Sequence, residues 1–328
     1  MRAIAYERVG PADDVLQLIE LPLPEPGPGE VRVRLHCSGV NPSDVKTRGG
    51  ARSRELPFPR IIPHSDGAGV IDAVGAGVDD ARVGERVWVW NAAWQRAEGT
   101  AAEAVVLPQH QAVRLPEGVS DEVGACLGIP ALTAWHAVHC NGGVAGKTVL
   151  IHGGAGSVGQ YALQMARLSG ARTIVTTVSS DEKAEIARGL GADVVLNYRT
   201  DPVQERVLAL TGGVGVDRVI EVEFSGNAEL DFAVVRQDGE ITVYGSDAGQ
   251  VSVPFFPAIV KNVNVQFFIV YNLSPADRVR AVSALTRLLE ADVLAHRIAA
   301  RVPLEQTAEA HRLVEEGKVI GNVVVTMT

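Results

Sequence analysis

The feature that most constrains this chain is a glycine-rich turn between an apolar strand pattern and a helical pattern. Residues 148–160 read TVLIHGGAGSVGQ. A strand, a tight glycine turn and a helix in this order let the backbone approach a pyrophosphate, to which the first helical amides donate hydrogen bonds. The spacing is a variant of the dinucleotide fingerprint, although glycine-rich loops also serve as plain turns. It predicts a nucleotide site at Gly153, Gly156, Ser157, Val158 and Gly159.

Length and composition indicate a two-domain globular protein. The chain has 328 residues, of which 46% are hydrophobic and 21% charged, as is usual for soluble enzymes with buried cores. The net charge of -9 argues against nucleic acid or an anionic membrane as a partner. The start, MRAIAYERVG, lacks the apolar core of a signal peptide, and no apolar run is long enough to span a bilayer.

The cysteines indicate a reducing compartment. Cys37, Cys126 and Cys140 are far apart and odd in number. They predict neither a disulfide framework nor a structural zinc site. We therefore expect a cytoplasmic protein.

The first third of the chain has the pattern of β structure. Residues 31–35 alternate apolar and basic side chains, as a half-buried strand does, and short strands are expected at 69–74 and 86–90. From residue 120 the pattern changes, and residues 123–140 have a helical pattern.

Strands and helices then alternate, which predicts a parallel sheet with right-handed crossovers. The expected strands are 148–151, 173–178, 194–196, 216–222, 240–244 and 264–270, and the helices 158–168, 182–190 and 203–210. Helices at 276–290 and 304–315 and a strand at 323–325 close the chain. We predict an α/β fold in which a doubly wound parallel sheet of about six strands is inserted into a β-rich domain.

The end of the second strand of this sheet indicates which dinucleotide binds. An acidic residue about 20 positions beyond the glycine turn holds the ribose hydroxyls of NAD in this fold. Here that place carries Ser179 and its neighbours, with Lys183 one turn into the next helix and Tyr198 after the third strand. A hydroxyl and an ammonium group suit the 2′-phosphate, so we predict NADPH (NADP+) rather than NADH.

A structural alternative exists for the same residues. Ser179 and Glu182 have the spacing of a helix capping box, with Lys183 as a solvated surface residue. A capping serine can also donate its hydroxyl to a phosphate, so both interpretations can hold. Asp181 argues the other way, because a small backbone shift would bring its carboxylate near the phosphate.

The chain resembles the medium-chain dehydrogenase/reductase superfamily, and within it the zinc-independent NADPH:quinone oxidoreductases of the zeta-crystallin-like branch. The motifs, besides the glycine turn, are CSGVNPSDVKTRGG at 37–50, HSDGAGVIDAVGAGV at 64–78, RVGERVW at 82–88 and GIPALTAWHAV at 128–138. The resemblance covers essentially the whole chain. It implies a GroES-like catalytic domain at 1–120, completed by 271–328, and a Rossmann dinucleotide-binding domain at 121–270.

The same resemblance bears on metal binding. Zinc-dependent relatives hold a catalytic ion with two cysteines and a histidine, at positions that correspond here to Asn41, Ser65 and Ile129. These side chains are poor zinc ligands, and His64, one residue from a ligand position, would stand nearly alone. We therefore predict no bound metal. Without a Lewis acid, the suitable hydride acceptors are quinones and conjugated enones, whose electron affinity already favours reduction.

The resemblance also implies the residues at the nicotinamide. Asn41 lies close to the ring in such relatives, and Thr133 packs beside it. Alternatives are local turn chemistry at Pro42 for Asn41 and helix packing for Thr133. The other residues implied at the cofactor are Gly245, Ser246, Phe268 and Asn322.

Two departures from the family concern the acceptor site. Lys46 stands where many quinone reductases have a tyrosine, and His64 where the family usually has glycine. Together with Asn41, these two form the candidate catalytic set. Trp88, Trp90 and Trp94 are expected either to form the floor of an aromatic acceptor site or to belong to the core.

The implied function is hydride transfer from NADPH to a quinone. Two alternatives stay open: reduction of the C=C bond of enones or alkenals, and NADPH binding without significant catalysis. The apolar strand around 265–270 is expected to pair across a two-fold axis, which predicts a homodimer.

Overall fold

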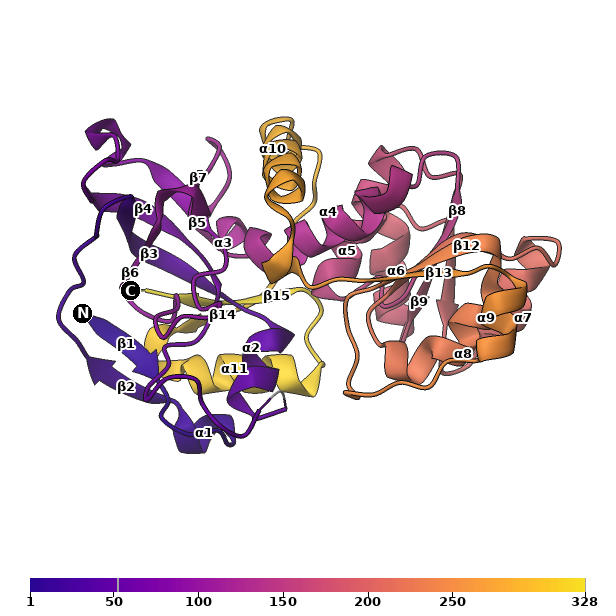
Figure 1. The fold of residues 1–328 in the computed structure, drawn as a ribbon, viewed down its shortest axis with the longest axis horizontal. Coiled ribbons are helices and arrows are strands. Elements are labelled where there is room, and N and C mark those ends of the chain that lie inside the picture. The colour runs from indigo at the N-terminus through magenta and orange to yellow at the C-terminus, as the bar shows by residue number, and fades with distance from the viewer. Residues whose placement is uncertain (52, 328) are drawn as a thin grey trace. The chain divides into compact units, whose positions relative to one another are not determined.

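A parallel sheet forms the centre of unit 2, the part of the chain from Ala131 to Ala281. The computed structural model describes residues 1–51 and 53–327, and over these ranges the sheet has the order β10-β9-β8-β11-β12-β13, with every neighbouring pair parallel. The strands are β8 (Thr148–Ile151), β9 (Thr173–Val178), β10 (Val194–Asn197), β11 (Val216–Glu221), β12 (Val235–Val243) and β13 (Asn264–Phe267). The predicted doubly wound sheet is confirmed (Figure 1).

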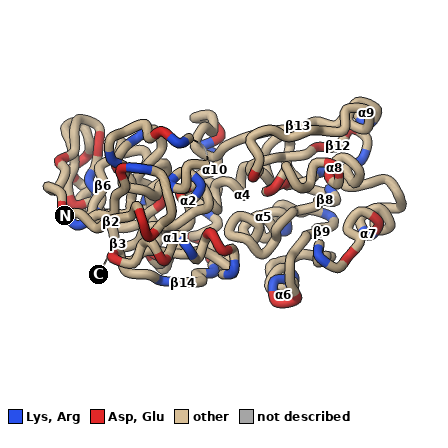
Figure 2. The backbone as a smooth tube through the Cα atoms, turned by 90° about the horizontal axis from the view of Figure 1, so that it is seen from below, with Lys and Arg blue, Asp and Glu red and all other residues tan. Residues whose placement is uncertain are grey.

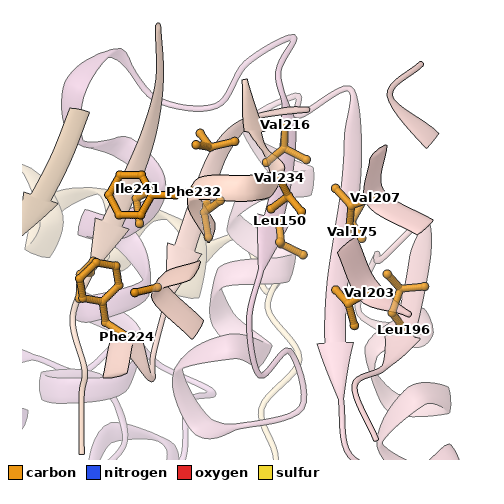
Figure 3. Packing of buried hydrophobic residues seen from close by; sticks show 14 residues of the cluster. Leu150, Val175, Leu196, Val203, Val207, Val216, Phe224, Phe232, Val234 and Ile241 are labelled. Atoms are coloured by element: carbon orange, nitrogen blue, oxygen red, sulfur yellow. The ribbon is translucent and has the colours of Figure 1, made fainter. Parts of the chain in front are cut away.

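The helices of unit 2, other than the one at Phe255–Val260, contribute buried side chains to its core. Its helices are α4 (Leu132–His139), α5 (Ser157–Leu168), α6 (Asp181–Gly189), α7 (Val203–Leu210), α8 (Phe224–Val234) and α9 (Phe255–Val260). Figure 3 shows Phe224 and Phe232 of α8 packed with Leu150 and Ile241 of the sheet. Burial of each such side chain contributes about 1.5–3 kcal/mol, which makes this cluster the core of unit 2.

Unit 1 comprises Met1–Pro130 and Val282–Thr328 and is built on a largely antiparallel sheet. Its main strands are β3 (Glu30–Val40), β4 (Asp66–Val74), β5 (Arg86–Val89), β6 (Ala104–Pro108), β7 (Ala112–Arg114), β14 (Ile298–Pro303) and β15 (Asn322–Thr326). A hairpin pairs β1 (Arg2–Ala5) with β2 (Gln17–Glu20). Because β15 pairs with β3, the end of the chain completes a sheet that the first third begins.

The remaining helices are α1 (Ala12–Val15), α2 (Pro42–Arg48), α3 (Asp121–Gly124), α10 (Pro275–Glu290) and α11 (Thr307–Glu316). Short 3-10 turns lie at Asp80–Arg82, Gln109–Gln111, Cys140–Gly142, Val270–Asn272 and Leu304–Gln306. Within the described residues, no helix is both long enough and apolar enough to cross a bilayer.

The helical segment predicted at 123–140 is confirmed in part, because the structure interrupts it. The segment consists of α3, a π-helical turn at Leu127–Ala131 and α4. Pro130 lies inside the turn and lacks the amide hydrogen that a regular helix requires, so the chain changes its hydrogen-bond pattern there.

Candidate functional site

The glycine turn of unit 2 brings bare backbone to the N-terminus of α5. Gly156 is the N-cap residue and has no side chain to occupy the first helical amides. A Cβ atom on Gly159 would lie 2.1 Å from the Gly153 carbonyl oxygen, and one on Gly154 would lie 2.2 Å from Thr176 Oγ1. The turn therefore needs glycines to close, and the amides of α5 remain available to an anion such as a pyrophosphate. The residues present fit a dinucleotide.

Polar groups converge at the end of β9. The Lys183 ammonium donates a hydrogen bond to Ser179 Oγ at 3.1 Å. Tyr198 follows β10, and its amide donates to the Val178 carbonyl at 3.0 Å, which brings Tyr198 next to the end of β9. The structure thus places Ser179, Lys183 and Tyr198 at the same edge of the sheet, where a 2′-phosphate is expected.

The expected capping box of Ser179 and Glu182 is wrong. Ser180 is the N-cap residue of α6, and its hydroxyl accepts from the Lys183 amide at 3.3 Å. The cap lies one residue later, so the Ser179 hydroxyl contacts the ammonium group instead. The acidic Asp181 and Glu182 precede Lys183, and Figure 2 accordingly shows both acidic and basic residues on α6.

The residues expected at the nicotinamide end of unit 2 lie in two groups. After β12, a Cβ atom on Gly245 would lie 2.1 Å from the Val222 carbonyl oxygen, so only glycine allows this close approach; Ser246 follows. Phe268 packs against His136 with ring centroids 4.6 Å apart. His136 lies one turn after the buried Thr133 on α4. Residues three apart on a helix lie on the same face, so His136 lies on the same face as Thr133. This spacing is the feature of the sequence from which the position of His136 could have been predicted.

In unit 1, one buried carboxylate connects Asn41 and Ile129, two of the positions that the resemblance aligns with zinc ligands. Asp66 Oδ2 accepts from the Asn41 side-chain amide at 2.9 Å and from the Ile129 backbone amide at 2.9 Å. Asn41 is also the N-cap residue of α2, and Asp44 accepts from its backbone amide at 2.8 Å. The side-chain amide of Asn41 is therefore held in one orientation by its hydrogen bond to Asp66.

His64 does not stand alone. Its Nε2 lies 2.8 Å from Nε2 of His311 on α11, a partner that the sequence pattern does not predict because 247 positions separate the two. His64 is fully buried and has a φ of 75°, which is unusual for a residue other than glycine. Its Nδ1 lies 2.8 Å from Ser38 Oγ, which lies 2.7 Å from Thr100 Oγ1.

The hydrogen bond from Thr100 to Asp66 determines which atom is the donor in each of the other hydrogen bonds of this series. Thr100 donates to the Asp66 backbone carbonyl at 2.6 Å, and a carbonyl oxygen only accepts. Ser38 must then donate to Thr100, His64 Nδ1 to Ser38, and His311 Nε2 to His64 Nε2. Burial lowers the pKa of His64 to about 3, so both rings stay neutral at ordinary pH. The chain of contacts fixes the segment that presents Asp66.

The other candidates of unit 1 have different surroundings. Lys46 is half-buried on α2. The Asn322 side-chain amide donates to the Arg297 carbonyl at 3.4 Å at the start of β15. Trp88 is fully buried, which supports a core role rather than an acceptor floor, and Trp90 is nearly so.

The chain is similar to known proteins along most of its length. Residues 27–117 match the alcohol dehydrogenase GroES-like domain and residues 157–287 the zinc-binding dehydrogenase family. A human quinone oxidoreductase is 31% identical, covering 97% of this chain and 94% of that protein. A 2-haloacrylate reductase of a Burkholderia species is 31% identical, covering 99% of this chain and 98% of that protein.

Solved structures have the same fold along the whole chain. An NAD-dependent alcohol dehydrogenase superimposes with a TM-score of 0.90 at 32% identity, covering 100% of both chains. A mycobacterial protein in complex with NADPH superimposes with a TM-score of 0.90 at 30% identity, also covering 100% of both chains.

Proposed function

Because the chain belongs to the medium-chain dehydrogenase/reductase superfamily, we propose that it is a zinc-independent oxidoreductase that reduces quinones with NADPH. The observation that carries the proposal is the set of side chains at Asn41, Ser65 and Ile129, which offers an amide, a hydroxyl and an alkyl group in place of zinc ligands. When bound, NADPH supplies the hydride. The chain must orient the ring and the acceptor and exclude water, and a quinone accepts a hydride without a Lewis acid.

We assign the cofactor contacts by the groups that the structure brings together. The pyrophosphate binds at the turn of Gly153, Gly156 and Gly159 and to the amides of Ser157 and Val158. The 2′-phosphate binds to Ser179, Lys183 and Tyr198. The nicotinamide end is lined by Thr133, Gly245, Ser246 and Phe268. In unit 1 we assign Asn41, Lys46 and Asn322 to the cofactor and acceptor, and His64 to the support of Asp66.

A second activity has specific support. The similarity to a 2-haloacrylate reductase favours reduction of an activated C=C bond, which also needs no metal. The cofactor assignment likewise meets a counterexample, since a neighbour of equal TM-score is described as NAD-dependent. For this chain the paired Ser179 and Lys183 favour the phosphorylated form.

A steady-state panel of quinones and acyclic enones, including 2-haloacrylate, tests the activity through NADPH oxidation. We expect quinones to give a kcat/KM at least about tenfold above the enones, and turnover to be unchanged after chelator treatment, because hydride transfer here uses no metal. Turnover of enones alone would favour the second activity. NADPH binding without turnover of any acceptor would identify a binding protein.

Replacing Lys183 with alanine should raise the Kd for NADPH about tenfold, because a charge-assisted contact to phosphate is lost. The Kd for NADH should remain almost unchanged. Fluorescence titration with both cofactors measures this, with Arg188→Ala as a control on the same helix, since Arg188 pairs with Glu185 instead. Equal weakening of both cofactors would show that Lys183 does not contact the 2′-phosphate.

We propose that the protein is a homodimer that pairs through β13. This strand is the last in the sheet order, and exposed aromatic side chains lie on it and on α9: Phe255 is 72%, Phe256 74% and Phe267 61% exposed. An open strand edge beside an apolar surface of this kind is suited to a second copy.

Phe256→Asp should convert the dimer to a monomer at micromolar concentration, because it buries a charge in the proposed interface. Light scattering coupled to size exclusion measures the mass. Val214→Asp, at a 65% exposed position between α7 and β11, is the matched control. A monomeric wild-type protein would contradict the proposal.

We also place the protein in the cytoplasm. The support is its thiols: Cys37, Cys126 and Cys140 are free, and burial raises the pKa of Cys37 to about 12, which keeps it protonated.

A further inference from the structure

A buried polar cluster lies beside the glycine turn of unit 2. It consists of His152, directly after β8, Glu221, the last residue of β11, and Asp231 on α8. Glu221 and Asp231 are fully buried and His152 is 3% exposed. His152 Nε2 lies 3.0 Å from Asp231 Oδ1 and 3.5 Å from Glu221 Oε2. His152 Nε2 thus faces the carboxyl groups of both Asp231 and Glu221 away from water. This arrangement is stable only when a proton lies between the imidazole nitrogen and a carboxylate oxygen.

The cluster is connected directly to the glycine turn. His152 Nδ1 lies 3.1 Å from Thr177 Oγ1, and the same hydroxyl oxygen accepts from the Gly153 amide at 3.2 Å. Desolvation lowers the pKa of His152, but the hydrogen bond to Asp231 and the charges of Glu221 and Asp231 outweigh it and raise the pKa. His152 therefore donates to Asp231 and holds Thr177, and Thr177 holds the first residue of the turn.

Glu221 connects the cluster to the start of α8. Its Oε1 accepts from the Glu223 amide, and Asn227 Nδ2 lies 3.2 Å from Oε1 and 3.1 Å from Oε2. From β12, the Tyr244 amide donates to the Glu221 carbonyl at 3.1 Å, and burial raises the pKa of the Tyr244 phenol, which stays neutral.

The protonation of Glu221 responds to its surroundings near neutral pH. Burial raises its pKa to about 7; the charge of His152 lowers it and that of Asp231 raises it further. Asp231 and Asn227 of α8, the Glu223 amide at the start of α8, His152 after β8 and Tyr244 after β12 are the groups that face it.

We propose that His152, Glu221 and Asp231 position the glycine turn for the dinucleotide, and that Glu221 takes up a proton when the dinucleotide binds. The inference rests on the proposed cofactor site. Phosphates bound at the turn add negative charge beside a buried carboxylate, which favours the neutral form of Glu221. Binding and protonation are then linked, so affinity must fall as pH rises through the titration of Glu221. His152 is a positioning residue, because it acts through Thr177 on Gly153.

Glu221→Gln tests the linkage, since glutamine keeps the shape and is always neutral. The Kd for NADPH is measured by fluorescence from about pH 6 to about pH 8.5, and we expect a rise of about threefold to tenfold in the wild type and none from this source in the variant. NADH serves as a second probe because it lacks the 2′-phosphate, which titrates in the same range. Glu205→Gln, at an exposed position on α7, is the control and should keep the wild-type slope.

Thr177→Val tests the positioning independently of Glu221. Valine is nearly isosteric but cannot bond Gly153 or His152, so Kd and KM for NADPH should rise about tenfold while kcat stays within about twofold. Thr177→Ser should restore both constants. A wild-type pH slope in Glu221→Gln, or wild-type constants in Thr177→Val, would overturn the inference. Failure of the wild type to bind NADPH would instead refute the proposed function.

Discussion

Gly159→Ala should abolish NADPH binding at concentrations that saturate the wild-type protein, with Kd raised at least about 100-fold. The added Cβ would lie 2.1 Å from the Gly153 carbonyl oxygen and 2.8 Å from the Gly154 Cα atom. Both obstacles are backbone atoms of the turn, so no side-chain rotation relieves the overlap. The start of α5 would have to move away from the turn, and its amides would lose their alignment on the pyrophosphate. Fluorescence titration of the folded variant measures the effect.

Gly189→Ala is the matched control for this substitution. Gly189 is the last residue of α6, and no heavy atom lies within 4 Å of the place that a Cβ atom would occupy there. Alanine at this position should leave Kd unchanged and favour the helix by up to about 1 kcal/mol. A Gly159→Ala protein that binds NADPH like the wild type would show that the glycine turn is not the dinucleotide site.

His64→Ala should lower the free energy of unfolding by about 3–4 kcal/mol. The substitution removes a fully buried ring, leaves Ser38 without its donor and leaves His311 Nε2 without its acceptor. Alanine, like histidine, has a Cβ atom that makes the φ of 75° energetically unfavourable. Glycine lacks this atom, so His64→Gly should be less destabilising than His64→Ala by about 1 kcal/mol. Urea denaturation at neutral pH compares the two variants, and equal losses would mean that backbone strain is negligible.

The same histidine predicts how stability depends on pH. Its folded pKa of about 3 lies below the unfolded value of about 6.5, so the unfolded chain binds more protons in this range. Stability contributed by His64 is therefore complete above about pH 6.5 and is lost as pH falls toward 3, with a slope of up to about 1.4 kcal/mol per pH unit. His64→Gly should remove this share, whereas substitution of the exposed His110 by glutamine should not. Identical slopes in wild type and His64→Gly would contradict the assignment.

Local pattern was enough to predict the sheet of unit 2. The strands at 148–151 and 173–178 and the helix at 203–210 have the predicted bounds, because each is a short apolar run or an amphipathic period between turn residues. The helix α8 was not predicted, since its apolar side chains do not gather on one face at the helical period and Gly226 lies within it. Pro130 is the residue from which the interruption before α4 could have been predicted. The apolar helical pattern continues on both sides of Pro130, so the pattern alone does not indicate the interruption.

The candidate site could be predicted from the sequence where it depends on local pattern. The glycine turn follows β8 and Ser179 follows β9, and because these parallel strands are neighbours, the turn and the Ser179–Lys183 pair lie at the same edge of the sheet. The pairing of His64 with His311 and the cluster around Glu221 join residues far apart in sequence. No pattern of spacing predicts such pairs, because they depend on which faces the folded chain brings together.

Unit 1 is assembled from two segments that flank unit 2 in the sequence, which determines when unit 1 of a newly made protein can finish folding. Unit 2 is one continuous stretch and is complete before the second segment of unit 1 has been synthesised. Strand β3 emerges from the ribosome long before its partner β15, and the interval is on the order of tens of seconds. During that interval residues 37–40 of β3 lack the strand that pairs with them. A chaperone that accompanies synthesis therefore has this part of β3 to shield until β15 arrives.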